Sequence, residues 1–361
     1  MNSPIVLHLV SGLSLMGGTS AKVYTLVKYS QYKHIIFYPH RESNQPFLSI
    51  WESLPNCTLV EGFTRKNYIK DAINVYRLLD KLHPNIIHAY FPPETIVASI
   101  VKLFHGKIKI IRSFEGNVNH NLFKRAVIKI ALSNFDKLIY ISKYVEDFYR
   151  KRIPASKKKN GCIIYNAAAH QKEVKIPIKH YADIKEIVTV SGLNPFKNLF
   201  TLIEAINILT KKGILVHLNI LGDGILKEKL QEKINEYHIN QYVSLLGYSD
   251  KVIEYLDASS IYVHPANNEG FGIAVIEAMQ RYCAIIVSNA GALPEIITNN
   301  VDGLIADVDN CMDWANKIEM LLNNQDLIDK LGRNAYLTAN KRFSVNKYVE
   351  EHEKLYKQLI K

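Results

Sequence analysis

Short runs of apolar residues alternate with longer segments of mixed polarity along the whole chain of 361 residues. A run of aliphatic, β-branched or aromatic residues bounded by polar ones is typical of a buried strand, whereas apolar residues spaced three or four positions apart indicate a helix that buries one face. Strands and helices that alternate in this way form a parallel sheet covered by helices on both faces. The predicted strands lie at residues 5–10, 35–38, 58–60, 86–89, 108–111, 138–141 and 162–165 in the first half, and at residues 187–190, 216–221, 243–246, 261–264, 285–288 and 304–306 in the second.

The two arrays of strands are separated by residues 170–185, which mix Lys, Pro, Glu and Gln without a clear period and which we interpret as a linker. The sequence therefore predicts an α/β protein with two Rossmann-like domains, at residues 1–170 and 185–340, that face each other across a cleft. Residues 341–361 follow the second domain, and a charged amphipathic helix is predicted within them at residues 345–359.

The segment from Glu269 to Glu277 places two carboxylates eight positions apart around a glycine turn that opens a predicted helix. It follows the predicted strand at residues 261–264 and so lies at the carboxyl edge of the sheet, where open α/β sheets bind ligands. Gly270 and Gly272 let a ligand approach the backbone closely, and the N–H groups of a helix N-terminus attract phosphate. Carboxylates suit hydroxyl groups instead. Together these groups predict a ligand with hydroxyls on either side of a diphosphate, which is the layout of a nucleoside diphosphate sugar.

The same segment has a simpler interpretation as an ordinary helix. In that case Phe271, Val275, Ile276 and Met279 are core residues, and the two acids lie on the solvated face. Glu277 argues against this interpretation, because it stands between apolar neighbours in the middle of the helix. The motif is therefore the strongest local indication of function in the chain.

Composition excludes several classes of protein. The apolar fraction of 48% is that of a globular protein, and no apolar run approaches the roughly 20 residues of a membrane-spanning helix. Residues 4–10 are apolar, but no basic segment precedes them, so they indicate a first strand rather than a signal peptide. The four cysteines are widely scattered and form no C-x-x-C pair, which argues against a disulfide framework or a zinc site and for a reducing cytoplasm.

The net charge of +11 is concentrated in one region, since residues 102–159 hold 15 Lys and Arg against four acids. Such an excess attracts a polyanionic acceptor, the anionic face of a membrane or nucleic acid. Nucleic acid is the least favoured of the three, because neither interleaved aromatic residues nor a known binding motif accompanies the charge. A basic amphipathic stretch in this region fits a membrane surface. It combines Phe123, Val127, Ile130 and Ala131 with Lys124, Arg125 and Lys129.

Several motifs of the second half occur together in one family of enzymes. They are His264-Pro265, the pair of Glu269 and Glu277, residues 288–297 (SNAGALPEII) and residues 302–305 (DGLI). With them the chain resembles the retaining GT-B glycosyltransferases of the glycogen-synthase-like family four, strongly in its second half and more loosely over its whole length. The resemblance implies that the first domain binds the acceptor, that the second binds a nucleotide sugar, and that the closing helix crosses back to the first domain.

The resemblance also implies a role for each residue of the predicted site. Glu277 would bind the ribose hydroxyls of the donor and Glu269 the hydroxyls of its sugar, while Lys197, in the loop after the strand at residues 187–190, would neutralise the diphosphate. The other expected contacts involve backbone groups of Gly270, Phe271, Gly272 and Ile273 near the sugar and diphosphate, of Gly17 and Gly18 in the matching loop of the first half, and of Gly222 in a turn on the nucleotide side.

Two positions depart from the family pattern. Gly192 stands where the family usually has an arginine, and Glu115 lies nearest to where relatives often have a histidine, in a predicted loop at residues 112–116. Arg112, in the same loop, is a candidate to supply the missing positive charge. His88 ends a predicted strand where similar enzymes carry a histidine, and both a catalytic role and a place in the core are compatible with it.

The resemblance predicts a retaining glycosyltransferase that moves a hexose-type unit from a nucleoside diphosphate sugar to a glycan or lipid-linked glycan. The process would be bacterial surface polysaccharide synthesis, as for capsule, O-antigen or lipopolysaccharide. We take the donor as UDP-linked, although the sequence leaves guanine open as well. No cofactor and no metal are expected. Asp307-Val308-Asp309 imitates the D-x-D metal motif of another glycosyltransferase fold, but the resemblance places it in a variable loop.

We expect the enzyme in the cytoplasm, with its basic patch at the inner face of the membrane. The sequence gives no indication of the oligomeric state. The alternatives are a catalytically silent GT-B-fold binding protein, a sugar-nucleotide epimerase and a phosphorylase.

Overall fold

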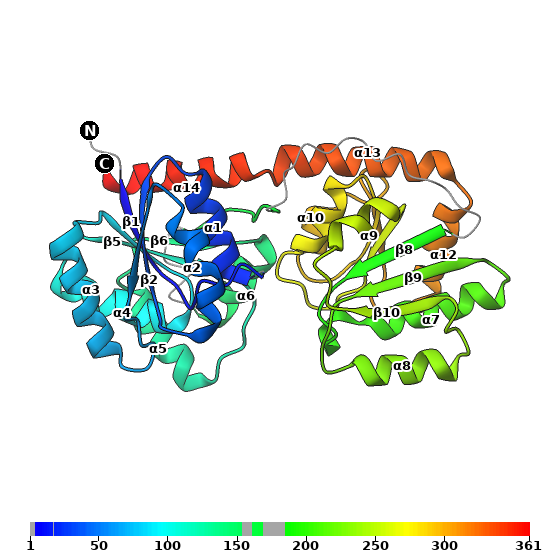
Figure 1. Cartoon of the computed structure of the whole chain (residues 1–361), viewed down its shortest axis with the longest axis horizontal. Coiled ribbons are helices and arrows are strands. Elements are labelled where there is room, and N and C mark those ends of the chain that lie inside the picture. The colour runs from blue at the N-terminus through cyan, green and yellow to red at the C-terminus, as the bar shows by residue number, and fades with distance from the viewer. Residues whose placement is uncertain (1–3, 17, 154–160, 169–184) are drawn as a thin grey trace. The chain divides into compact units, whose positions relative to one another are not determined.

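The computed structural model describes residues 4–16, 18–153, 161–168 and 185–361. The chain divides into two compact units: unit 1 comprises Met1–Ala169 together with Val345–Lys361, and unit 2 comprises His170–Ser344. Each unit is built on one parallel sheet with helices on both of its faces (Figure 1). The predicted fold class, an α/β protein with two Rossmann-like halves, is confirmed.

Seven strands form the sheet of unit 1, in the order β3-β2-β1-β4-β5-β6-β7. The order changes direction between β1 and β4, and at such a switch point the loops after two neighbouring strands diverge and leave room for a ligand. All seven strands predicted for the first half are present. Their bounds are β1 Ile5–Leu9, β2 Lys33–Tyr38, β3 Cys57–Glu61, β4 Ile86–Ala89, β5 Lys109–Phe114, β6 Lys137–Tyr140 and β7 Gly161–Ile163.

Strand β5 is longer than its apolar pattern indicates. The predicted loop at residues 112–116 is wrong for its first three residues, Arg112 to Phe114, which continue β5 and pair with β6. The physical reason is an aromatic contact across the two strands: Phe114 stacks on Tyr140, with ring centroids 5.0 Å apart. Glu115 is therefore the first residue after the strand.

The helices of unit 1 begin at well-defined caps. Asn67, Asn121 and Ser142 each accept a hydrogen bond from the backbone N–H three residues later, which satisfies one of the free donors of the helix that follows. The bounds in unit 1 are α1 Gly18–Tyr29, η1 Glu42–Asn44, α2 Gln45–Glu52, α3 Tyr68–Leu82, α4 Pro92–Phe104, α5 Leu122–Leu132, α6 Lys143–Arg152 and α14 Val345–Ile360.

Helix α14, the last of the chain, packs in unit 1. Its side chains Tyr348, Val349 and Tyr356 join aliphatic residues of the sheet in one buried cluster. The end of α1 binds the same helix, because Ser30 donates from its hydroxyl to the Glu353 carboxylate over 2.7 Å. Residues that follow unit 2 in the sequence thus complete the core of unit 1.

Four histidines form a cluster in the core of unit 1. His8 Nε2 lies 2.9 Å from His34 Nδ1, and His88 Nδ1 lies 2.8 Å from the Tyr356 hydroxyl. Burial lowers the pKa of all four rings, His352 being the last, to about 3 for His34 and about 4 for His352. The rings are therefore neutral at physiological pH. Of the two interpretations that the sequence left open for His88, the structure favours a hydrogen-bonded core residue.

Unit 2 contains a six-stranded sheet in the order β10-β9-β8-β11-β12-β13, with its switch point between β8 and β11. All six strands predicted for the second half are present, and the core between sheet and helices is almost wholly aliphatic. The strands are β8 Lys185–Val190, β9 Val216–Leu221, β10 Val243–Gly247, β11 Ile261–His264, β12 Ala284–Ser288 and β13 Leu304–Ala306. The helices are η3 Pro195–Lys197, α7 Leu199–Lys211, α8 Lys227–Glu236, α9 Val252–Ala258, α10 Ile273–Gln280, α11 Leu293–Ile296, α12 Cys311–Leu322 and α13 Gln325–Arg342.

Candidate active site

The two residues predicted to be catalytic, Lys197 and Glu269, lie together in unit 2. Lys197 follows β8 and Glu269 follows β11, and these strands are neighbours at the switch point of the sheet. The Lys197 Nζ atom lies 2.5 Å from Glu269 Oε2, and the two side chains are 19% and 15% exposed. His264, the last residue of β11, reaches the same carboxylate, with Nε2 3.1 Å from Oε2. The structure thus brings a cation and an anion together at the carboxyl edge of the sheet.

The loops that carry Lys197 and Glu269 are tied to each other by the backbone. The Asn267 N–H, just before Glu269, donates to the Phe196 carbonyl over 3.0 Å. Asn198 has φ 52°, a left-handed conformation that asparagine tolerates, and it ends the short turn of Lys197 where α7 begins. The two charged side chains are therefore positioned by their loops as well as by their mutual attraction.

Glu269 is ionised and His264 is neutral. Burial opposes the charge of Glu269, but the hydrogen bond from His264 and the positive charge of Lys197 outweigh burial and lower the pKa of the carboxyl to about 2. Burial also lowers the pKa of His264. A neutral His264 that donates from Nε2 accepts at Nδ1, which lies 3.1 Å from the Tyr262 hydroxyl. A chain of hydrogen bonds from Tyr262 through His264 therefore orients the Glu269 carboxylate.

Gly291 fixes the backbone of Glu269. It lies in the loop after β12 with φ 62°, and a Cβ atom at this position would lie 2.5 Å from the Glu269 carbonyl oxygen. The next residue, Ala292, donates its N–H to the same oxygen over 2.9 Å. Only glycine allows two backbone segments to approach this closely. The sequence contained Gly291 as one letter of a motif, and nothing in the pattern pointed to its contact with Glu269.

The glycine turn between the two acids opens helix α10. Gly272 has φ 105°, a conformation that residues with a side chain rarely adopt. Phe271 is 3% exposed and packs edge-on against Phe343, so only its backbone is available to a ligand. The N–H groups of Val275 and Ile276 donate to the Gly272 carbonyl, which leaves those of Ile273 and Ala274, at the start of α10, as a suitable site for an anion. The predicted contacts of this turn, Gly270 included, with a donor stay predictions.

Glu277 differs from Glu269 in its electrostatic state. It is half-buried on α10, and it has no ion-pair or hydrogen-bond partner among the described residues. Burial raises the pKa of its carboxyl to about 7. A carboxyl in this state is stabilised in its charged form by ligand groups that donate hydrogen bonds to it. The protein holds Glu269 charged, whereas Glu277 lacks such support and suits a ligand with neighbouring hydroxyls.

Gly222 supports the Lys197 loop from the end of β9. Its φ is 132°, and a Cβ atom there would lie 1.9 Å from the Ser191 carbonyl oxygen. Beside this contact, the Leu193 N–H donates to the Asp223 carbonyl over 2.9 Å. Glycine is therefore required for packing between two loops. Its role at a nucleotide stays a prediction.

Two polar side chains of the same loop were not singled out from the sequence. Ser191 Oγ and Asn194 Oδ1 are buried and have no hydrogen-bond partner within the part of the chain that the structure describes. Buried polar atoms of this kind are unfavourable unless water or a ligand satisfies them. Their place in a strand-to-helix loop is the one signal that the sequence offers, and they join Lys197 as candidates for contact with a donor.

The remaining predicted residues belong to unit 1. Gly17 lies outside the described residues, and Gly18 is the first residue of α1, with φ 73°. Glu115 forms an ion pair with Lys22 of α1. Arg112 is 4% exposed and lines a pocket within unit 1, and its suggested action at the donor diphosphate stays a prediction.

Helix α5 carries the predicted basic amphipathic stretch, with one correction. Ala131 was assigned to the side that faces a membrane, but it is buried, because it lies three positions after Ile128 on the face that packs into the core. The large exposed apolar residues of α5 are Leu122, Phe123 and Ile130, each at least 72% exposed. The charged residues of the helix are all basic.

The described residues contain no helix that is both long and apolar enough to cross a bilayer. They also contain no group of three or more His, Cys, Asp or Glu arranged to hold a metal ion. In the D-x-D segment, the Asp307 carboxylate accepts the N–H of Asp309 over 3.1 Å, and Asn310 then caps α12. This segment therefore has a local structural role as a turn before a helix.

Known proteins share the fold and much of the sequence pattern. Residues 170–338 match the family described as Glycosyl transferases group 1. An uncharacterized glycosyltransferase from Methanocaldococcus jannaschii is 28% identical over 356 residues, which cover 95% of this chain and 95% of that protein. The O-antigen biosynthesis glycosyltransferase WclY from Escherichia coli is 22% identical over 296 residues, 77% of this chain and 80% of that protein. Most other curated relatives are matched over less than two thirds of their own length.

The similarity extends to three dimensions. HepE from Anabaena, solved in complex with UDP, superposes with a TM-score of 0.82 at 16% identity, over 98% of this chain and 100% of that chain. Identity at this level shows the fold alone. The predicted GT-B fold and the family resemblance are confirmed.

Proposed function

Since residues 170–338 match the family described as Glycosyl transferases group 1, we propose that the chain is a glycosyltransferase that transfers a sugar from a UDP-linked donor to a glycan or lipid-linked glycan, with retention of anomeric configuration. We further propose that the product is a bacterial surface polysaccharide such as capsule, O-antigen or lipopolysaccharide. The names of WclY, an O-antigen enzyme, and of HepE, solved with UDP, support this choice. The observation that carries the proposal is the Lys197–Glu269 ion pair at the switch point of unit 2.

The ion pair suits a donor that brings both hydroxyls and phosphate. Hydroxyls of the donor sugar can replace Lys197 as partners of the Glu269 carboxylate, because that carboxylate is ionised and accepts only. The Lys197 ammonium is then released to the diphosphate. When the bond from the anomeric carbon to the diphosphate breaks, negative charge develops on the leaving group, and Lys197 and the first N–H groups of α10 stabilise it.

Retention follows from the family resemblance and requires no protein nucleophile. The acceptor oxygen forms its bond to the anomeric carbon on the face from which the diphosphate departs. The proton of the acceptor hydroxyl passes to a phosphate oxygen of the leaving group. In this scheme the protein contributes positioning, electrostatic stabilisation and exclusion of water.

Transfer and hydrolysis assays with a panel of UDP and GDP sugars test the proposal. We expect Lys197→Met and Glu269→Gln each to lower kcat by roughly 10²–10³-fold with at least one UDP sugar, while circular dichroism shows a folded protein. Lys212→Met is the matched control, because Lys212 also pairs with a glutamate, Glu319, at 2.7 Å on the surface of the same unit. Its activity should equal that of the wild type. The anomeric proton coupling of the product, read by NMR, reports retention.

Turnover by the wild type also separates the enzyme from a silent binding protein. Such a protein would bind a nucleotide sugar without converting it, which the glycine at position 192 would favour. If no donor in the panel is turned over although UDP binds, the transferase proposal is wrong. If neither UDP sugars nor GDP sugars bind, the prediction of a donor site in unit 2 is wrong.

We also propose that α5 holds the enzyme against the anionic inner face of the membrane. Leu122, Phe123 and Ile130 are exposed apolar residues on a helix whose charged residues are all basic, which is the combination that binds an anionic lipid surface. We expect flotation with vesicles that contain phosphatidylglycerol, and loss of flotation in high salt or in Phe123→Ser. Leu337→Ser, at an exposed position of unit 2, is the control. Equal flotation with neutral vesicles would contradict the proposal.

A further inference from the structure

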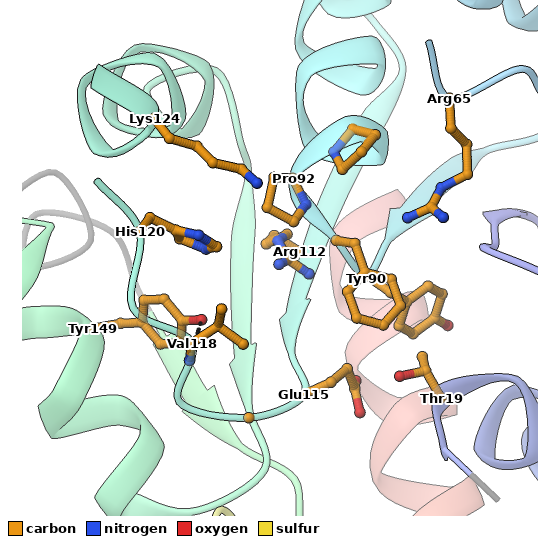
Figure 2. Close-up of a pocket in the computed structure, with 13 residues that line it drawn as sticks. Thr19, Arg65, Tyr90, Pro92, Arg112, Glu115, Val118, His120, Lys124 and Tyr149 are labelled. Atoms are coloured by element: carbon orange, nitrogen blue, oxygen red, sulfur yellow. Dashed lines mark hydrogen bonds between the residues drawn. The ribbon is translucent and has the colours of Figure 1, made fainter. Parts of the chain in front are cut away.

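A pocket of about 350 Å³ lies at the carboxyl edge of the sheet in unit 1, and its size is that of small-molecule sites in general. Residues after β4, at the end of β5 and at the starts of α1, α4 and α5 line it (Figure 2). We propose that this pocket binds a phosphoryl group of the acceptor. The inference rests on the proposed function and narrows it, because it makes the acceptor a phosphorylated or diphosphate-linked glycan rather than a neutral one.

Arg112 is the main reason, because it is a buried cation without a carboxylate partner. Its side chain lines the pocket, is 4% exposed, and lies over the ring of Phe114 with the guanidinium carbon 4.8 Å from the ring centroid. One guanidinium nitrogen donates to the Ser113 carbonyl, but Nε has no hydrogen-bond partner in the described part of the chain. A guanidinium does not lose its proton to escape burial. An unpaired buried charge is strongly unfavourable, so an anion is the natural ligand at this position.

Each of the two carboxylates near the pocket forms its ion pair with a cation other than Arg112. They form two ion pairs: Arg65 with Glu94 at 3.0 Å, and Lys22 with Glu115. The cations left without an ion pair among the described residues of the pocket are Arg112 and Lys124. In Figure 2, Lys124 and His120 approach from one side and Arg65 from the other, with Arg112 between them.

The positive charges of Arg112 and Lys124 also affect the pKa of His120. Burial lowers the pKa of its ring, and the charges of Lys124 and Arg112 lower it further. Thr19, in the first turn of α1, adds a hydroxyl and the positive end of a twelve-residue helix. Among the described residues that line the pocket, the cations that lack an ion pair, Arg112 and Lys124, thus favour an anion.

Two uncompensated positive charges favour a phosphoryl group over a carboxylate. A carboxylate carries one negative charge, whereas a phosphate monoester carries roughly 1.5 to 2 at neutral pH and a diphosphate at least as much. The planar guanidinium also binds two phosphate oxygens at once. The other walls, which include Tyr90 and Pro92, are apolar and suit a sugar ring or an isoprenyl chain.

The test uses the full chain with UDP at a saturating concentration, so that the donor site is occupied, and inorganic pyrophosphate as the probe in isothermal titration calorimetry. We expect the wild type to bind pyrophosphate and Arg112→Met to bind it at least tenfold more weakly. Arg112→Lys should fall between them, because lysine keeps the charge and loses the bidentate geometry. Lys109→Met, which removes a cation from the amino end of the same strand, is the matched control and should bind as the wild type does.

The inference can be overturned by either of two measurements, the affinity for pyrophosphate or the affinity for UDP. Pyrophosphate affinity that is unchanged in Arg112→Met, or absent in the wild type, would show that the pocket is no phosphoryl site. Loss of UDP affinity in Arg112→Met would show that Arg112 binds the donor instead of a phosphoryl group of the acceptor. Neither outcome affects the transferase proposal, which is measured separately by turnover of the donor panel.

Farnesyl diphosphate in a parallel titration distinguishes the two sources of the phosphoryl group. A lipid-linked acceptor predicts at least tenfold tighter binding of farnesyl diphosphate than of pyrophosphate, and loss of that gain in Phe123→Ser, because Phe123 is exposed beside Lys124 on α5. A water-soluble phosphorylated glycan predicts equal affinity for both probes. Both results support a phosphoryl site.

Discussion

Each unit of the molecule places a cation at the carboxyl edge of its sheet, but the two cations differ in their partners. In unit 2, Lys197 lies 2.5 Å from Glu269, and this carboxylate is also bound by His264. In unit 1, Arg112 is buried without a carboxylate partner among the described residues. In a paired site, a ligand that brings both hydroxyls and phosphate can replace each charged side chain as the partner of the other. An unpaired buried cation indicates a ligand that brings the anion alone.

The cores of the two units also differ in how many titratable side chains they bury. Unit 1 buries a cluster of four neutral histidines linked to tyrosines, whereas the core of unit 2 is almost wholly aliphatic and His264 is its one buried histidine within the described residues. Polar groups in a core keep their partners only in one protonation state. The stability of unit 1 should therefore depend on pH far more than that of unit 2.

Acid should produce the largest difference between the units. The pKa of each of His8, His34, His88 and His352 is lower in the folded state than the unfolded value near 6.5, so the stability that they contribute is present above that pH and lost as the pH falls. At pH 5 the loss approaches about 2 kcal/mol for each of His34 and His352, whose pKa values in the folded state are about 3 and about 4. In unit 2 the raised pKa of Glu277 acts in the opposite direction, since protonation there favours the folded state.

The two tryptophans of the chain allow each unit to be followed alone, because Trp51 belongs to unit 1 and Trp314 to unit 2, and both are fully buried. Urea unfolding is followed by fluorescence at pH 7 and pH 5 in Trp314→Phe, which reports unit 1, and in Trp51→Phe, which reports unit 2. We expect the Trp51 midpoint to fall steeply with acid and the Trp314 midpoint to change little. Equal shifts in both variants would refute the contrast.

Substitution of the two cations should change stability with opposite sign. Lys197→Met leaves the buried Glu269 charge with His264 as its remaining partner, so the free energy of unfolding should fall by about 1–3 kcal/mol. Arg112→Met replaces an unpaired buried charge with an apolar side chain of similar length, and the free energy of unfolding should stay equal or rise by up to about 1 kcal/mol. Thermal unfolding at pH 7.5 measures both. A destabilised Arg112→Met protein would mean that the protein itself pairs this charge.

The smallest expected effect concerns Glu277. Its pKa of about 7 means that the carboxylate able to accept ribose hydroxyls is depleted about tenfold between pH 8 and pH 6, so UDP affinity should fall by a similar factor. Glu277→Gln should bind UDP more weakly at pH 8 and lack this part of the pH dependence. Calorimetry on both proteins isolates the carboxyl, because the phosphates of UDP titrate equally in each. Parallel pH profiles would remove Glu277 from the site.

The strands of both sheets were predictable because each buried strand is a short apolar run between polar segments, and this pattern depends on neighbouring residues alone. The end of β5 was not predictable in this way, because Phe114 belongs to the strand through a contact with Tyr140, which lies 26 positions later in the sequence. The side of α5 on which Ala131 lies was also missed, because apolar residues occur on both faces of that helix and the sequence does not say which face is covered.

The donor site was partly predictable for a similar reason. Lys197 and Glu269 follow strands that the pattern located, and strand ends meet at one edge of a parallel sheet. The support from Gly291, by contrast, and the opposite pKa shifts of Glu269 and Glu277 depend on burial and on contacts between distant loops. The pocket around Arg112 combines residues from 19 to 149, so no local pattern could reveal it.

A crystal structure of the chain with UDP bound tests the central claim most directly. The account predicts the diphosphate within hydrogen-bond distance of Lys197 Nζ and of the first N–H groups of α10, and the ribose hydroxyls on the Glu277 carboxylate. UDP held by Arg112 in the pocket of unit 1, with Lys197 still paired to Glu269 and Glu277 without a ligand, would contradict it.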